Sequence, residues 1–286
     1  MSQTPDQRTA ASVRARLLNL SKERDELFDL TLARFALERF LYRLSQTKYR
    51  KRLILKGAML FQLWNGVPLR PTRDLDLLAT GDADRDEISK IVREIVLTKV
   101  DDDGIVFNLD KLIVQNIRED AEYGGVRATF IARLGSAVIP VQIDFGTGDA
   151  VTPEPVEATY PTMLAMPSPV LLTYPRETVV AEKLEAIVNL GMDNSRMKDY
   201  FDLWFLATTH TFDLDQLRLA VKRTFERRKQ PLPSGLPIGL TDEFMNDPTK
   251  QRQWLAFQGR SIGTALALSE VVAVIRDFAL PLFDNT

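Results

Sequence analysis

Hydrophobic residues recur at two different spacings along the chain, and these spacings divide it into predicted helices and strands. Apolar positions three or four residues apart predict amphipathic helices, whereas alternation of apolar and polar positions predicts strands with one buried face. The helical spacing covers residues 9–18, 27–44, 87–97, 178–190, 196–203 and 262–282. Short apolar or alternating runs predict strands at residues 53–55, 74–78, 105–108, 112–117, 126–134 and 138–145.

Turn residues and prolines indicate how these elements are connected. Gly135 and Ser136 separate the last two predicted strands, which should therefore form an antiparallel pair. Residues 152–175 contain six prolines, a composition typical of a stiff connection between lobes. We therefore predict a bilobed α+β chain. Residues 1–160 would form a core with a mixed β-sheet and N-terminal helices, and residues 161–286 a helical C-terminal domain.

Composition restricts the chemistry that this chain can perform. Among 286 residues there is no cysteine and one histidine, His210. Disulfides, thiolate zinc sites, cysteine nucleophiles and multi-histidine metal clusters are therefore excluded. Any transfer or hydrolytic chemistry must rest on carboxylates, lysines and arginines.

Charge and hydropathy bear on the partners of the chain. A net charge of −2 argues against a surface that binds polyanions everywhere, although the basic run at residues 222–229 could contact RNA phosphates or form a solvated helix end. The sequence has no signal peptide and no apolar run long enough to span a bilayer. We expect a cytoplasmic protein with no membrane partner.

The most informative stretch is residues 56–78, in which Asp74 and Asp76 alternate with Leu75 and Leu77. On a strand, both carboxylates would point to one face, roughly 7 Å apart at their backbones. Two like charges at this distance favour a cation between them, and Mg²⁺ prefers carboxylate oxygens and retains positions for water and phosphates. The alternative is an Asp-x-Asp pair that occurs by chance at a strand end.

Basic and glycine residues flank the aspartate pair. Lys56 and Gly57 follow an apolar strand and precede a helix-like segment, an arrangement in which backbone N–H groups favour phosphate. Arg70 and Arg73 add positive charges that could hold a triphosphate.

A third carboxylate, Asp144, lies on the predicted strand 138–145, where Val141, Ile143 and Phe145 alternate with it. Burial of a lone carboxylate is costly, and a metal site would supply a partner. The alternative is an edge strand that exposes Asp144 to solvent.

The helical half carries three further candidates. Lys183 falls within the apolar face of the predicted helix 178–190, where it needs an anionic partner unless it extends toward solvent. Asp199 and Asp202 are three residues apart on the next helix and so share one face. They are well placed to orient Lys183 or Arg196, although surface ion pairs would give the same pattern.

Taken in order, these residues resemble the AbiEii/AbiGii toxin family, whose members are nucleotidyltransferases of the polymerase-beta superfamily. The resemblance spans roughly residues 53–206. The third of its four motifs matches Thr178–Leu184 around Lys183, the fourth matches Lys198-Asp199 with Asp202, and the first two match Lys56, Gly57, Arg70, Thr72, Arg73, Asp74 and Asp76. Polymerase-beta-type transferases also place a third acid on the strand next to that of the aspartate pair, and Asp144 resembles it.

The resemblance implies a fold and a set of roles. The fold would be a nucleotidyltransferase-type mixed sheet followed by a helical lobe, with the nucleotide between the two. Metal ligands would be Asp74, Asp76 and Asp144, and these three would be catalytic together with Lys183 and Asp199. The nucleotide would contact the residues Lys56, Gly57, Arg70, Arg73, Lys183 and Asp202.

The resemblance also implies an activity. We expect a Mg²⁺-dependent toxin of a toxin–antitoxin or abortive phage infection system, with two magnesium ions, a nucleoside triphosphate (NTP) substrate and a cognate antitoxin. It would transfer a nucleoside monophosphate (NMP) to a hydroxyl acceptor, first of all the 3′ end of tRNA. The alternatives are a protein-modifying transferase that AMPylates a protein hydroxyl and a metal-dependent nuclease that uses the same carboxylates.

Overall fold

The computed structural model describes residues 5–81, 83–119, 123–261 and 265–283. Its internal contacts divide the chain into two compact units. Unit 1 comprises Met1–Gly148 and Val156–Thr173, and unit 2 comprises Asp149–Pro155 and Tyr174–Thr286. The chain therefore leaves unit 1, returns to it for a short segment, and then enters unit 2 for the remainder of its length.

Unit 1 consists of a sheet with helices. Its helices are α1 (Pro5–Glu23), α2 (Phe28–Ser45), η1 (Lys48–Lys51), η2 (Gly57–Met59), α3 (Leu60–Asn65) and α4 (Arg85–Val96). Its strands are β1 (Leu53–Lys56), β2 (Asp74–Ala79), β3 (Ile105–Glu119), β4 (Tyr123–Leu134), β5 (Ala137–Thr147), β6 (Val156–Thr159) and β7 (Val170–Thr173).

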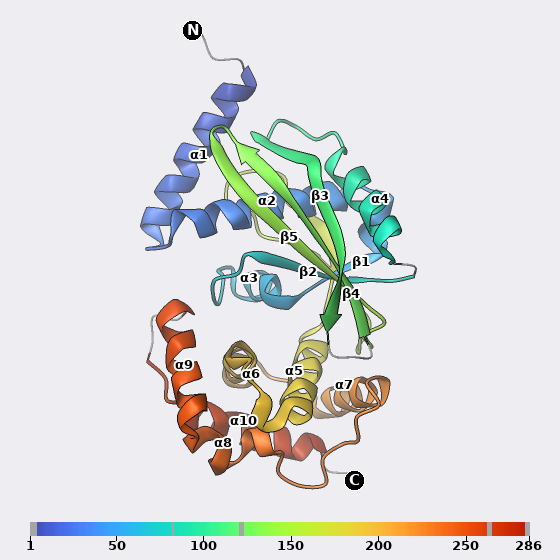
Figure 1. Ribbon diagram of the computed structural model, residues 1–286, viewed down its shortest axis with the longest axis vertical. Coiled ribbons are helices and arrows are strands. Elements are labelled where there is room, and N and C mark those ends of the chain that lie inside the picture. The colour runs from blue at the N-terminus through green and yellow to red at the C-terminus, as the bar shows by residue number, and fades with distance from the viewer. Residues whose placement is uncertain (1–4, 82, 120–122, 262–264, 284–286) are drawn as a thin grey trace. The chain divides into compact units, whose positions relative to one another are not determined.

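The seven strands form one mixed sheet in the order β3-β4-β5-β2-β1-β7-β6 (Figure 1). The pairs β2–β5 and β1–β7 are parallel, and the other neighbours are antiparallel. The antiparallel pair predicted around Gly135 is β4–β5. The mixed-sheet α+β fold is thus confirmed.

One face of the sheet forms the core of unit 1. The alternation in β5 buries Val141, Ile143 and Phe145, while Gln142 and Asp144 on the opposite face are only partly covered. Helix α2 contacts β5, α4 contacts β3 and β4, and the two helices contact each other. The apolar spacing in α4 directs Ile88, Ile91, Val92 and Ile95 inward. The polar face of the sheet is consequently the one available for chemistry.

Two features of the sheet differ from the sequence prediction. The proline-rich stretch contains β6 and β7, which were not predicted, and β7 pairs with β1 in the interior of the sheet order. Residues 105–108 and 112–117, predicted as two strands, belong to the single strand β3, whose register shifts between Asn108 and Ile113. This irregularity in the pairing explains why the alternation in the sequence is interrupted there.

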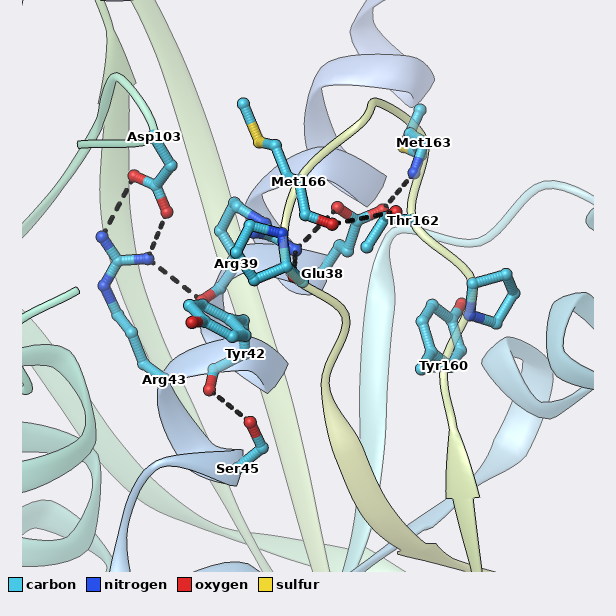
Figure 2. Close-up of polar contacts among 12 residues, drawn as sticks. Glu38, Arg39, Tyr42, Arg43, Ser45, Asp103, Tyr160, Thr162, Met163 and Met166 are labelled. Carbon is cyan, nitrogen blue, oxygen red and sulfur yellow. Dashed lines mark hydrogen bonds and ion pairs between the residues drawn. The ribbon is translucent and has the colours of Figure 1, made fainter. Parts of the chain in front are cut away.

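Buried polar side chains of α2 fix the surrounding loops (Figure 2). Arg43 donates to both carboxylate oxygens of Asp103, at 2.7 and 3.1 Å, just before β3 begins. Glu38 accepts a 2.7 Å hydrogen bond from the backbone N–H of Met163, in the loop between β6 and β7. Arg39 donates to the Pro167 carbonyl in the same loop. Buried groups of this kind are stable because each has a specific partner.

Unit 2 is helical, as predicted for the C-terminal part. Its described elements are α5 (Arg176–Leu190), η3 (Gly191–Asp193), α6 (Met197–Thr209), α7 (Leu214–Arg227), η4 (Ile238–Leu240), α8 (Asp242–Asn246), α9 (Pro248–Ser261) and α10 (Leu268–Phe283). Helix α10 contacts α6, α7 and α8. The predicted last helix began at residue 262, but residues 262–264 lie outside the described residues and α10 begins at Leu268.

The basic run after α7 has an internal role at one position. Arg228 forms ion pairs with Glu185 of α5 and, at 3.5 Å, with Asp149. Burial alone would lower the pKa of Arg228, but the charges of Glu182, Glu185 and Asp149 raise it. At this position the run therefore supports the packing of unit 2. No helix among the described residues is both long and apolar enough to cross a membrane.

Candidate active site

Three neighbouring strands of unit 1 align the predicted carboxylates. In the parallel pair of β2 and β5, Asp74 lies opposite Gln142 and Asp76 lies opposite Asp144. In the antiparallel pair of β1 and β2, Lys56 lies opposite Asp76. Residues in register on neighbouring strands point to the same face, so Lys56, Asp76 and Asp144 form one row across the sheet. Asp74 is on the same face, two residues away along β2.

The position of Asp144 excludes one of the two alternatives left by the sequence, the solvated edge strand. Strand β5 lies between β4 and β2 and is therefore not an edge strand. The side chain of Asp144 is 14% exposed, which a solvated edge position would not produce.

Gly57 lies directly against Asp76. Its φ angle is +73°, a left-handed conformation that favours glycine. A Cβ atom at this position would be 1.9 Å from Oδ2 of Asp76 and 2.8 Å from its Cβ. The glycine that follows β1 thus allows the backbone to approach the carboxylate, and any side chain there would displace Asp76.

Arg70 and Arg73 belong to the segment that leads into β2. Thr72 shapes its end: the Thr72 hydroxyl donates to the Asp74 carbonyl at 3.2 Å and accepts from the Asp74 N–H at 3.4 Å. Arg73 is exposed and Arg70 is partly buried. The segment therefore carries two arginines to the beginning of the strand on which Asp74 and Asp76 lie.

Sequence reasoning missed the partner of Asp144. Arg127 of β4 lies opposite Asp144 in the β4–β5 register. Its Nε donates to Oδ1 at 2.8 Å and its terminal nitrogen donates to Oδ2 at 2.7 Å. Such a two-point contact is among the strongest between an arginine and a carboxylate. The signal was present in the sequence, because the turn at Gly135 sets which residues of the two strands face each other.

The carboxylates can be compared with what a divalent cation requires. Asp74, Asp76 and Asp144 supply the oxygen donors that Mg²⁺ prefers, from positions in register on neighbouring strands. Within the described ranges, however, no three acidic or histidine side chains stand together as a group that could hold one ion. The donor types fit a cation, and both oxygens of Asp144 are engaged with Arg127.

A second cluster lies within unit 2. Lys183 of α5 extends its Nζ to Asp199 Oδ1 at 2.7 Å and to Asp202 Oδ2 at 2.8 Å, both on α6. Arg196 Nε lies 2.6 Å from Asp199 Oδ2. Both carboxylates are fully buried, whereas the Lys183 side chain is 14% exposed. The expected contact between the two aspartates and Lys183 is therefore present, and it is not a surface ion pair.

Two opposing effects set the pKa of Asp199 in this cluster. Burial alone would raise the pKa of Asp199, but the nearby charges of Lys183 and Arg196 outweigh it and hold that pKa below its usual value. A lysine held by two buried carboxylates has a fixed direction, so its ammonium group is positioned before any ligand arrives.

The predicted site residues thus fall into two groups. Unit 1 holds Lys56, Gly57, Arg70, Arg73, Asp74, Asp76 and Asp144, and unit 2 holds Lys183, Asp199 and Asp202. The catalytic and binding roles of both groups stay predictions.

Comparison with known proteins decides the family. Residues 39–279 match the family described as nucleotidyl transferase AbiEii toxin, type IV TA system. The chain belongs to the AbiEii family. Membership establishes the chain as a nucleotidyltransferase of the type IV toxin–antitoxin class, which implies an NTP substrate and an antitoxin partner.

Other comparisons give the following results for this AbiEii-family chain. Among curated proteins, none matches its sequence. A solved structure of a candidate nucleotidyltransferase from Helicobacter pylori is 18% identical, with a TM-score of 0.47 over 86% of this chain and 91% of that one. JHP933 from Helicobacter pylori is 15% identical, with a TM-score of 0.49 over 86% and 88%.

Proposed function

We propose that this AbiEii-family toxin is Mg²⁺-dependent and transfers an NMP from an NTP to the 3′-terminal hydroxyl of tRNA. The observation that carries the proposal is the register that aligns Lys56, Asp76 and Asp144 on one face of the sheet, with Asp74 beside them. A cluster of carboxylates beside a lysine is suited to a metal-bound triphosphate.

Each residue of unit 1 has a role in this proposal. Asp74, Asp76 and Asp144 would hold two magnesium ions. Bound magnesium would neutralise the phosphates and lower the pKa of the attacking hydroxyl. The ammonium group of Lys56 would bind a phosphate oxygen next to Asp76. The backbone of Gly57 would approach the phosphates closely, because no Cβ intervenes.

Three further basic side chains would bind phosphate oxygens of the triphosphate. Arg70 and Arg73 would contact phosphate oxygens through their planar guanidinium groups. Lys183 would contribute a further cation whose direction is set by Asp199 and Asp202, as supported by the 2.7 and 2.8 Å contacts. Asp199 would act through Lys183 as a positioning residue rather than by contact with the reacting atoms.

The transfer forms one bond to phosphorus and breaks one. The acceptor oxygen forms a bond to the α-phosphorus, the bond between the α-phosphorus and its bridging oxygen to the β-phosphate breaks, and pyrophosphate leaves. The acceptor proton passes to solvent. Both substrates occur in the cytoplasm, where the toxin would act and its antitoxin would restrain it.

The test is to incubate the purified chain with Mg²⁺, total tRNA and each α-labelled NTP in turn. Transfer of label to tRNA by the wild type, and its loss in Asp76→Asn, would support the proposal and identify the nucleotide. Asp86→Asn is a matched control, because Asp86 lies in the first turn of α4 and outside the row.

Other outcomes would replace parts of the proposal. Label on protein rather than RNA would move the acceptor to a protein hydroxyl. Shortened RNA without label would indicate a nuclease that uses the same carboxylates.

A further inference from the structure

Arg127 has a contact that the proposed reaction does not use. Its guanidinium donates to both oxygens of Asp144, and its side chain is 31% exposed against 14% for Asp144. Strand β4 supplies this residue on the same face as the row of Lys56, Asp76 and Asp144, so the row extends across four strands. Along it the charges run positive, negative, negative, positive.

The positive charge of Arg127 also acts on Asp74 and Asp76. Arg127 is in register with Asp144, which is in register with Asp76, and Asp74 lies two residues from Asp76 on the same face of β2. The guanidinium therefore helps to neutralise all three carboxylates that we assign to the metal site. Its positive charge thus has part of the neutralising effect that a bound metal ion would have.

Arg127 and a divalent cation would both bind the oxygens of Asp144. A carboxylate that gives both oxygens to one arginine has its strongest acceptor positions engaged. A divalent cation that recruits Asp144 must share its oxygens with the guanidinium and must also approach a fixed positive charge. Both effects weaken cation binding in the absence of other ligands.

We propose that Arg127 is the internal counter-ion of Asp144 and competes with the divalent cation for it, so that metal binding moves Asp144 from Arg127 toward Asp76. Arg127 is thus a positioning residue that sets the metal affinity of the site. The inference rests on the proposed function, because it requires that a cation bind between these carboxylates.

The test is a Mn²⁺ titration of the full chain without nucleotide, in which free Mn²⁺ is followed by electron paramagnetic resonance. In Arg127→Gln, Mn²⁺ should bind about tenfold more tightly, the effect expected for loss of one positive charge near a divalent ion. Arg127→Lys keeps the charge but loses the two-point contact, so its affinity should be intermediate.

Arg133→Gln is the matched control. Arg133 lies on the same strand and face as Arg127, about 20 Å away along β4, and its neighbours in register are Val106 and Val138. Removal of its charge should change the Mn²⁺ affinity less than twofold. In an Asp144→Asn background, Arg127→Gln should tighten binding less than it does in the wild type, because charge repulsion is still relieved but the contested carboxylate is absent.

The results separate this inference from the proposed function. If Arg127→Gln binds Mn²⁺ with unchanged or weaker affinity while Asp76→Asn abolishes binding, the competition is refuted and the metal site remains. If Asp76→Asn binds Mn²⁺ as the wild type does, the proposed metal site itself is refuted.

Discussion

At the scale of single residues, the ion cluster of Lys183 allows its contribution to stability to be tested separately from its proposed function. Lys183→Met would leave Asp199 and Asp202, which are fully buried, without their shared cation. We expect the free energy of unfolding to fall by about 3–5 kcal/mol, because one partner of a buried pair has been removed. Urea denaturation followed by circular dichroism measures this loss.

A second variant separates stability from function. Lys183→Met combined with Asp202→Asn removes both charges of one ion pair, and Asp199 retains Arg196 at 2.6 Å. This pair of changes should restore at least half of the lost stability but none of the nucleotide transfer. Recovery of transfer together with stability would mean that Lys183 is only structural.

Glu38 makes stability depend on pH. Burial raises the pKa of Glu38 from 4.5 to about 7, against the lowering effects of Arg39 and the Met163 N–H. The folded state therefore retains a proton that the unfolded state releases, and stability should decrease as the pH rises from 4.5 to 7. The loss should be at most ~3 kcal/mol.

Glu38→Gln provides the comparison for this effect. Glutamine cannot ionise but can still accept the hydrogen bond from Met163 (Figure 2). The difference in unfolding free energy between the wild type and Glu38→Gln should therefore shift across this pH window in favour of the variant. Parallel curves would show that Glu38 does not titrate there.

Some of the site was predictable at the residue scale and some was not. The alternation of Asp74 and Asp76 with leucines gave their common face directly, and the helical spacing of Asp199 and Asp202 did the same. Arg127 was missed although the turn at Gly135 pairs Leu134 with Ala137 and thereby pairs Arg127 with Asp144. The buried polar groups of α2 could not be predicted, because their partners are distant in sequence.

At the scale of elements, the turn after β1 gives a test with an internal control. Gly57 and Gly66 have nearly the same φ angle, +73° and +75°. A Cβ at Gly57 would collide with Asp76, whereas a Cβ at Gly66 meets nothing within 4 Å. Alanine at either position should cost about 1 kcal/mol of backbone strain.

The two alanine variants should differ in activity. Gly57→Ala should reduce nucleotide transfer at least ~100-fold, because a displaced Asp76 corresponds to a misplaced catalytic group. Gly66→Ala should transfer nucleotide at nearly the wild-type rate. Equal activity of the two variants in a labelled-NTP assay would show that the close approach of Gly57 to Asp76 is not required.

Strands β6 and β7 show where sequence patterns are insufficient. Each has only four residues, and prolines at 153, 155, 161, 167, 169 and 175 surround them. Their pairing is decided by distant partners, since β7 lies parallel to β1 more than a hundred residues earlier. Local patterns cannot report a contact of that kind.

At the scale of the whole molecule, the return of the chain to unit 1 has a consequence for fragments. A fragment of residues 1–160 lacks β7, which pairs with β1, whereas residues 1–173 include it. We expect dispersed amide signals in the NMR spectrum of the longer fragment and poor dispersion for the shorter one. Similar spectra for both would mean that β7 is dispensable for the sheet.

Membership in the AbiEii family establishes the chain as a nucleotidyltransferase, and we propose that these residues perform its reaction. In our proposal, the row of carboxylates in unit 1 supports transfer of the NMP from an NTP. The most direct test compares α-labelled and γ-labelled NTP with tRNA, Mg²⁺, and either the wild type or Asp76→Asn. We expect α-label on the tRNA 3′ end, γ-label in pyrophosphate, and neither product with Asp76→Asn. Transfer of γ-label to the acceptor, or equal transfer by Asp76→Asn, would contradict it.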